Sequence, residues 1–137
     1  MKFFHPTEST RFHIDFTWFE REGKNINSLR QLLPPEYQEA LTEELEGWVD
    51  LVDDQTGEVR SIPKIAYLVR RYRAQDKNFI ARGMPITEAA FRLLLLNNNQ
   101  PMTAAEIASQ LGRRPAEVLA QIGGRAVYNG IRPVADE

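Results

Sequence analysis

The first regular pattern in the chain is an alternation of apolar and polar residues over positions 11–18. Side chains of a β-strand point alternately to its two faces, so this alternation predicts a half-buried strand. Phe19 breaks the alternation and marks the predicted end of the strand. The side expected to face the core carries four large side chains, namely Phe12, Ile14, Phe16 and Trp18.

A second alternating segment covers positions 48–61 and surrounds a turn signal, Asp-Asp-Gln-Thr-Gly, at 53–57. Aspartate and glycine favour tight turns, because aspartate can bind nearby backbone N–H groups and glycine tolerates a positive φ. The segment therefore predicts a β-hairpin, with Val49, Leu51 and Val59 flanking its turn.

Helical spacing separates these two predictions. Three leucines between Asn27 and Leu33 are spaced as on one face of a short helix, and the following Pro34 and Pro35 would end it. Positions 36–45 have the pattern of a second helix.

Pro63 can open a third helix, which extends to about Gln75. Its apolar residues follow the i, i+3, i+4, i+7 spacing of a buried helix face, and basic residues lie on both flanks of that face. These basic residues are auxiliary candidates for contacts with phosphate groups: Arg70, Arg73 and Lys77 on one flank, and Lys64 and Arg71 on the other.

Gly83 and Pro85 mark the expected junction between two halves of the chain. We place an N-terminal α+β region at 1–83 and a C-terminal region at 84–137, which are either separate or parts of one compact unit. The next helix is expected to begin at Glu88, with Thr87 as its N-cap. It contains four successive leucines, which imply burial on more than one face and contact with both halves.

Positions 103–121 carry three residues at the offsets of a helix-turn-helix. A small residue at Ala108 lets two helices approach, Gly112 permits a left-handed turn, and Val118 fills the corner between the helices. Three requirements with different causes thus coincide within one short window.

The flanks of this window support the same interpretation. Thr103 and Glu106 have the spacing of a capping box, and Pro115 suits the first turn of the following helix. The tail at 126–134 has apolar residues around an Asn-Gly pair at 129–130, which favours a small β-element or wing over another helix.

The order helix, helix, turn, helix, extended segment over 87–134 resembles the winged helix-turn-helix family. The resemblance implies that the helix at 115–122 enters the major groove of DNA. It rests on Ile107, Ala108, Leu111, Gly112 and Val118, with Asn129 and Gly130 where a wing tip would fall.

The resemblance also implies a set of DNA-contacting side chains. Gln121 would address adenine and Glu117 a cytosine amino group. Arg113 and Arg114 would face the groove at the turn, and Arg125 and Arg132 would reach phosphates from the following segment. The implied set is Arg113, Arg114, Glu117, Gln121, Arg125 and Arg132.

The charge distribution modifies this expectation. The chain has a net charge of −2, and positions 84–137 carry five basic and five acidic residues, so they offer no general attraction to a polyanion. Positions 36–58 contain nine acidic residues and no basic one, whereas 60–82 contain seven basic residues and one acidic. Either these blocks neutralise each other as solvated faces, or the basic block supplies phosphate contacts that the C-terminal region lacks.

Composition narrows the class of protein. A 42% hydrophobic and 26% charged composition is that of a globular chain, and the absence of cysteine fits a reducing compartment, so we expect a soluble cytoplasmic protein. The longest aliphatic run, at 93–96, is far shorter than the roughly 20 residues needed to span a bilayer. No membrane association is therefore expected.

Catalysis has little support in the sequence. The one candidate cluster is His13 with Asp15, on the same side of the first predicted strand and joined by Glu20, which could share a metal ion. A surface hydrogen bond explains the first two residues equally well. No phosphate-binding loop, nucleophile elbow or metal-binding helix motif is present. We expect no catalytic residues, no metal site and no cofactor.

Aromatic residues leave a different alternative open. They could anchor a protein interface, where aromatic side chains concentrate binding energy, or fill the core. The residues concerned are Trp18, Phe19, Trp48, Tyr67 and Tyr72.

The sequence therefore predicts an α+β protein in which an N-terminal strand, helices and hairpin pack against a C-terminal winged helix-turn-helix-like unit. The leading hypothesis for its function is a non-enzymatic, transcription-associated protein that binds double-stranded DNA. The alternative is a protein-interaction module, binding a partner or a second copy of itself, that keeps the same scaffold without nucleic-acid contact.

Overall fold

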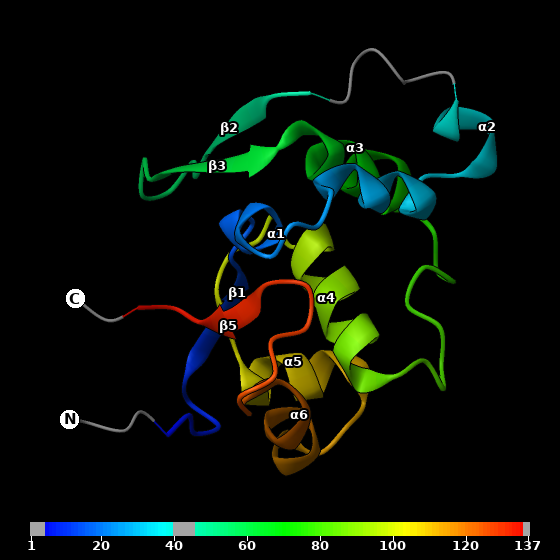
Figure 1. Cartoon of the computed structure of the whole chain (residues 1–137). Coiled ribbons are helices and arrows are strands. Elements are labelled where there is room, and N and C mark those ends of the chain that lie inside the picture. The colour runs from blue at the N-terminus through cyan, green and yellow to red at the C-terminus, as the bar shows by residue number, and fades with distance from the viewer. Residues whose placement is uncertain (1–4, 40–45, 136–137) are drawn as a thin grey trace.

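The computed structural model describes residues 5–39 and 46–135 and shows an α+β fold of helices and antiparallel strands, which confirms the predicted fold class (Figure 1). The elements in chain order are β1 (Arg11–Ile14), α1 (Thr17–Arg21), the 3-10 helix η1 (Ile26–Leu32), α2 (Pro35–Gln38), β2 (Trp48–Val52), β3 (Val59–Pro63), α3 (Lys64–Arg73), α4 (Ile86–Leu96), β4 (Met102–Thr103), α5 (Ala104–Leu111), α6 (Pro115–Ile122) and β5 (Ile131–Pro133).

Strand β1 lies at the centre of a three-stranded antiparallel sheet, between β4 and β5. Phe12 is opposite both Met102 of β4 and Pro133 of β5, and Ile14 is opposite Ile131. Phe12 and Ile14 are buried, as their alternation with polar residues predicted. The sheet thus joins the first strand of the chain to two strands of the C-terminal region (Figure 1).

The predicted strand over 11–18 is wrong beyond Ile14, because the chain turns at Asp15. The Asp15 carboxylate accepts hydrogen bonds from the backbone N–H (3.1 Å) and the hydroxyl (2.6 Å) of Thr17, and helix α1 begins there. Trp18 therefore lies on a helix. Phe16 and Phe19 are both buried, and their spacing of three residues suits a helical turn as well as a core.

The C-terminal tail contains the small β-element that its sequence predicted. Asn129 (φ 48°) and Gly130 (φ 83°) form a tight turn, closed by a 2.9 Å hydrogen bond from Ile131 N–H to the Tyr128 carbonyl. After this turn, β5 pairs with β1 and not with another strand of the tail. Within the described residues, a wing formed by the tail alone is therefore absent.

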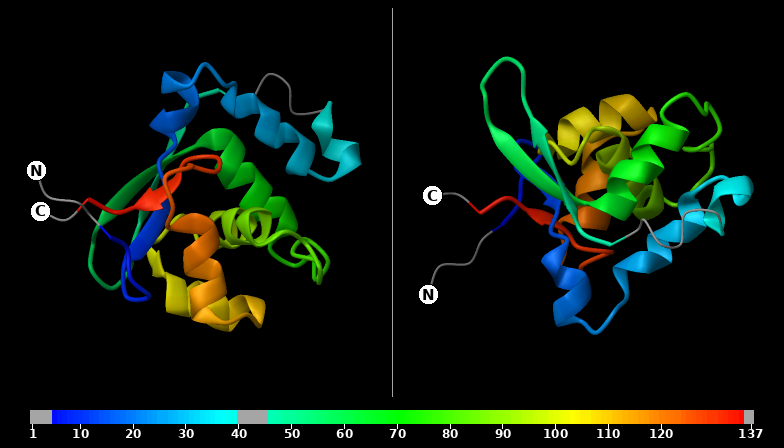
Figure 2. Two further views of the ribbon diagram at one scale, coloured as in Figure 1. Left: turned by 60° about the horizontal axis from the view of Figure 1, so that its bottom comes forward. Right: turned by 90° about the horizontal axis from the view of Figure 1, so that it is seen from above.

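Strands β2 and β3 form the predicted hairpin, with Val52 opposite Val59. In its turn, Asp53 Oδ1 accepts hydrogen bonds from two backbone N–H groups. The hairpin extends away from the helices, as the right-hand view of Figure 2 shows. Ile62 is buried at its base, whereas Trp48 is exposed on the outer side.

Of the three helices predicted for the N-terminal region, the first matches η1, which ends before the double proline as expected. The other two end earlier than predicted. Helix α2 ends at Gln38, so the predicted helix over 36–45 is confirmed only in its first turn, and positions 40–45 lie outside the described residues. Helix α3 ends at Arg73, slightly before the predicted Gln75.

Helix α4 begins at Ile86, two residues earlier than predicted. Pro85 is its N-cap, and its carbonyl accepts a 2.9 Å hydrogen bond from Ala89 N–H, so Thr87 lies inside the helix and does not cap it. The helix packs against β1, α3, α5 and α6. This confirms the predicted burial on more than one face and places α4 at the centre of the molecule (Figure 1).

One hydrophobic cluster continues across the predicted junction at Gly83. It contains fully buried side chains from both regions, including Phe12 of β1, Ile65 of α3, Phe91 of α4 and Val118 of α6. The two regions therefore share a core. In the described part of the chain, no helix combines the length and the apolar character that crossing a membrane requires.

Candidate functional site

Helices α5 and α6 form a pair whose local structure follows the sequence spacing. Thr103 Oγ1 accepts a hydrogen bond from Glu106 N–H (3.0 Å), and Glu106 Oε1 accepts one from Thr103 N–H (2.8 Å), which confirms the capping box. Gly112 ends α5 with a φ of 67°, the left-handed conformation expected there. Arg113 N–H then donates to the Ala108 carbonyl at 2.9 Å and closes the turn.

The corner between the two helices is filled by small and branched side chains. Ala108 and Val118 are fully buried, and Ile107 and Ile122 are buried beside them. Helix α6 also packs against α4. Because these contacts hold one face of α6, its opposite face is turned outward, and we call this exposed face the α6 surface.

The α6 surface carries two small side chains, with an arginine before the helix and another after it. Ala116 and Ala120 are exposed one helical turn apart, with the exposed Gln121 beside them. Arg114 precedes the helix and Arg125 follows it, and both are exposed. At 1.5 Å per residue, the eight residues of α6 span about 12 Å. The arginines therefore bracket a short, accessible helix face.

Glu117 forms ion pairs with both arginines of the turn. Its Oε1 accepts a hydrogen bond from Arg114 Nε at 3.1 Å, and its Oε2 lies 3.6 Å from Arg113 Nη1. The hydrogen bond from Arg114 is the main cause that lowers the pKa of Glu117, so this carboxylate is charged. The side chain of Arg114 is 84% exposed and that of Glu117 34%, so the arginine is the more accessible charge.

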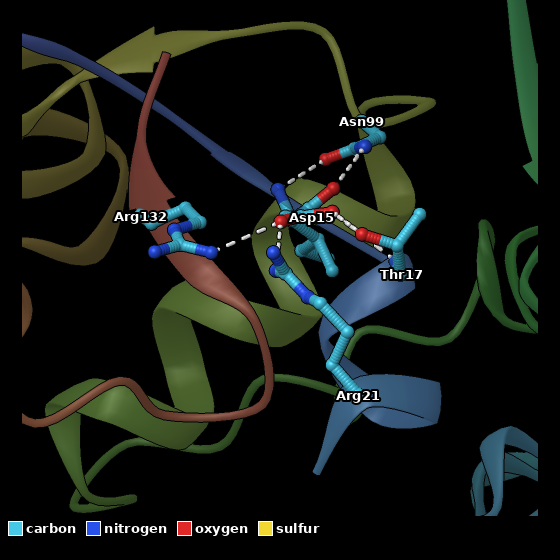
Figure 3. Close-up of polar contacts among 6 residues, drawn as sticks. Asp15, Thr17, Arg21, Asn99 and Arg132 are labelled. Carbon is cyan, nitrogen blue, oxygen red and sulfur yellow. Dashed lines mark hydrogen bonds and ion pairs between the residues drawn. The ribbon is translucent and has the colours of Figure 1, made fainter. Parts of the chain in front are cut away.

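Arg125 and Arg132 border a common groove beside the end of α6, so the structure brings these two predicted residues together. Arg125 has no ion pair within the described residues. Arg132, on β5, points its Nη1 toward Asp15 Oδ2 at 3.1 Å (Figure 3). Its guanidinium thus links β5 to the segment that follows β1.

The Asp15 carboxylate is the common acceptor in a polar cluster with Thr17, Arg21 and Arg132 (Figure 3). Its Oδ2 also accepts a 2.7 Å hydrogen bond from Arg21. Burial raises the pKa of Asp15, but hydrogen bonds from Thr17 and Arg132 outweigh that effect and lower it. The carboxylate therefore remains charged and ties three segments together.

Asn99, drawn beside this cluster in Figure 3, has a structural role that the sequence did not reveal. Its Nδ2 donates to the Ile14 carbonyl (2.8 Å), and its Oδ1 accepts from Ile14 N–H (2.7 Å). Strand β4 pairs with β1 only at Arg11 and Phe12, so Asn99 takes the place of a further strand residue. The one available signal was an asparagine run after a helix, since asparagine tolerates the left-handed backbone that Asn99 adopts, with a φ of 56°.

The auxiliary basic residues lie on α3 or shortly after it, and α3 does not lie beside α6. Helix α4 lies between α3 and the α5–α6 pair in both Figure 1 and the left-hand view of Figure 2. Arg70 Nε donates to the Leu96 carbonyl at 3.4 Å, and Arg73 Nε donates to the Leu32 carbonyl at 2.8 Å. Arg73 also forms a 2.6 Å ion pair with Asp76. Both arginines therefore join neighbouring segments of the fold.

The other auxiliary residues differ in exposure. Arg71 is exposed on α3, and Lys64 is half-buried at its first position. Lys77 is exposed but follows the end of α3, so the predicted helical stripe through Arg70, Arg73 and Lys77 is wrong at its last member.

The predicted pair of His13 and Asp15 does not form a metal-binding group. Asp15 lies outside β1 and is occupied by Thr17, Arg21 and Arg132. Burial lowers the pKa of His13, although the charge of Asp15 acts in the opposite direction. Among residues 5–39 and 46–135, no group of three histidine, cysteine or acidic side chains is placed to hold a metal ion.

Two exposed features are candidate interaction surfaces: the α6 surface with its flanking arginines, and the outer side of the β2–β3 hairpin. No protein-family model, curated protein or solved structure matches this chain.

Proposed function

We propose that this protein binds double-stranded DNA without catalysing a reaction, and that it acts in transcription through the α6 surface. One observation carries the proposal: an exposed helix, held by its buried opposite face, has exposed arginines at both ends. A helix with side chains is about 10–12 Å wide, and the major groove of B-DNA is about 12 Å wide. The dimensions of α6 are thus compatible with insertion.

Each side chain of the α6 surface has a role in this proposal. Ala116 and Ala120 are small enough for the helix to approach the base edges closely. Gln121 pairs with adenine through its amide in this proposal. Arg113 and Arg114 before the helix and Arg125 after it bind phosphates and fix the position of the helix. Glu117 restrains the arginines of the turn and does not read a base.

The order α4, β4, α5, turn, α6 and β5 also supports kinship with the winged helix-turn-helix family. In this proposal, β1 completes the sheet that a wing strand would otherwise complete. The DNA-binding unit then depends on residues from both ends of the chain. A fragment restricted to 84–137 would lack the central strand of its sheet.

Fluorescence anisotropy with a mixed-sequence duplex tests the proposal. Three phosphate contacts, by Arg113, Arg114 and Arg125, predict that affinity falls about 40-fold between 50 and 200 mM salt. Replacing Arg113 and Arg114 by alanine leaves one contact and reduces this dependence to about 3.5-fold. The matched control is an Arg71→Ala/Lys77→Ala variant, which removes two exposed charges on the α3 side of α4.

The outcomes separate cleanly. Weaker, less salt-dependent binding by the Arg113→Ala/Arg114→Ala variant, with the control unchanged, supports DNA contact through α6. Equal losses in the two variants would indicate only non-specific attraction to positive charge. Absence of binding at low salt would contradict the proposal.

A second candidate function is protein interaction through the hairpin. Trp48, Val52 and Val59 are 57%, 61% and 58% exposed, and the strand register places all three on one side of β2 and β3. The other aromatic candidates are buried or packed against the core, so Trp48 is the exception. Sedimentation at increasing protein concentration tests self-association. Dimer formation that Trp48→Ser abolishes supports this function, whereas a monomer at every concentration excludes a homodimer.

A further inference from the structure

A groove of about 770 Å³ lies beside the turn of the α5–α6 pair. It runs between α4, the α5–α6 turn and the segment that precedes α4. Its volume falls within the range of about 300–1,000 Å³ that is typical of small-molecule pockets. The DNA-binding role proposed above does not require such a groove.

One part of the groove, which we call its floor, is lined by apolar side chains. Ile86, Ala89 and Leu93 line it from successive turns of α4, and Leu111 lines it from the end of α5. Ile86, Leu93 and Leu111 pack against the core but remain partly exposed. An apolar body seated here would remove this remaining surface from water, which favours binding.

The rim of the groove carries a net positive charge. Arg82 and Arg113 both line it, and Arg82 is exposed with no ion pair in the described part of the chain. Glu117 also lines the rim, but its closer partner is Arg114 at 3.1 Å, whereas Arg113 lies 3.6 Å away. The Arg113 guanidinium therefore has donors available for another acceptor.

We propose that this groove binds a small amphipathic carboxylate. Its apolar ring or chain lies on the α4 floor, and its carboxylate lies between Arg82 and Arg113. A guanidinium matches the two oxygens of a carboxylate and binds them more strongly than a neutral acceptor. A neutral ligand would accept only weaker hydrogen bonds from the two arginines, and a cationic ligand would be repelled by them.

Binding of such a ligand has a consequence for the α6 surface, and this part alone rests on the proposed function. Arg113 is shared between the groove and the proposed DNA contacts. A carboxylate bound to Arg113 neutralises one phosphate-binding charge, so the ligand weakens DNA binding and lowers its salt dependence.

Calorimetric titration with 1-naphthoate and 1-naphthamide tests the ligand site, because the two probes share their rings and differ in charge. We expect the carboxylate to bind about tenfold more tightly than the amide, and Arg82→Gln to weaken naphthoate binding about tenfold. Arg71→Gln is the control, since it removes an exposed arginine elsewhere. Circular dichroism verifies that both variants fold.

Failure to bind naphthoate, equal affinity for the two probes, or unchanged binding by Arg82→Gln would each overturn the ligand site. These titrations contain no DNA, so their result is independent of the proposed function. A separate DNA titration in saturating naphthoate tests the coupling. Reduced DNA affinity supports it, and unchanged affinity overturns the coupling while the ligand site stands.

Discussion

The two hydrogen bonds that Asn99 makes to Ile14 lead to a quantitative stability prediction. Asn99→Gly removes both bonds but retains a residue that tolerates the φ of 56°. Asn98→Gly is a matched control, because Asn98 has the same φ of 56° and its buried Oδ1 has no hydrogen-bond partner in the described part of the chain. The comparison therefore isolates the side-chain bonds from the backbone effect of glycine.

The expected loss of stability follows from the burial of the Ile14 backbone groups to which Asn99 is hydrogen-bonded. Ile14 is 1% exposed, so water cannot readily replace both lost partners. Leaving a buried donor and a buried acceptor unpaired costs about 2–6 kcal/mol in total. For a chain of 137 residues, this corresponds to a fall in Tm of about 7–21 °C relative to the control.

Urea unfolding followed by circular dichroism measures this difference. We expect the Asn99→Gly variant to unfold at a lower urea concentration with an unchanged m-value, because the fold is retained. We expect Asn98→Gly to remain close to the native chain. An Asn99→Gly variant as stable as the control would refute the role assigned to Asn99 in completing the sheet.

Three further predictions follow from other contacts. Glu117→Gln releases Arg113 and Arg114 and removes a negative charge. DNA affinity measured by anisotropy should therefore rise by about fivefold, corresponding to about 1 kcal/mol. Weaker binding would instead favour base reading by Glu117. The lowered pKa of Asp15 means that its stabilising effect is present above the pKa of the unfolded chain and is lost as pH falls through the folded value. Asp15→Asn should therefore destabilise the protein more at pH 7 than at pH 3, and an equal loss at both values in urea unfolding would contradict this. Gly130→Ala combines a φ of 83° with a Cβ only 2.6 Å from the Asp15 carbonyl oxygen. In thermal unfolding it should lower the free energy of unfolding by about 2–4 kcal/mol. Gly57→Ala, which has open space around it, should lower that free energy by only about 1 kcal/mol.

Local features of the fold could be predicted from the sequence. The capping box at Thr103, the left-handed Gly112 and the buried Val118 each depend on residues within a few positions of one another. The hairpin turn at Asp53 is local in the same sense. Short-range geometry is encoded in residue type, so spacing is sufficient to find it.

Features that depend on distant partners could not be predicted. Nothing in the pattern around Phe12 indicates that β1 would pair with strands about 90 and 120 residues away. The alternation that ends at Trp18 also fits a strand followed by a helical turn, and only the Asp15 hydrogen bonds decide between them. Periodicity predicts which side of an element is buried, but not the element against which it packs.

In the candidate site, too, the local features could be predicted and the distant pairings could not. The exposed positions of Arg114 and Gln121 follow from helix geometry and could be predicted. The pairing of Arg132 with Asp15 and of Arg73 with Asp76 could not, because the charge of a residue does not reveal its partner. The sequence pattern therefore predicts phosphate contacts for Arg73 and Arg132, whereas the fold uses both side chains to join its own segments.

An NMR titration of isotope-labelled protein with duplex DNA locates the DNA contact without any substitution. DNA recognition by α6 predicts that backbone amide shifts concentrate over residues 113–125, at the turn, α6 and Arg125, while the amides of α3 and of the β2–β3 hairpin remain unchanged. Absence of shifts, or shifts confined to the hairpin, would contradict DNA recognition by α6.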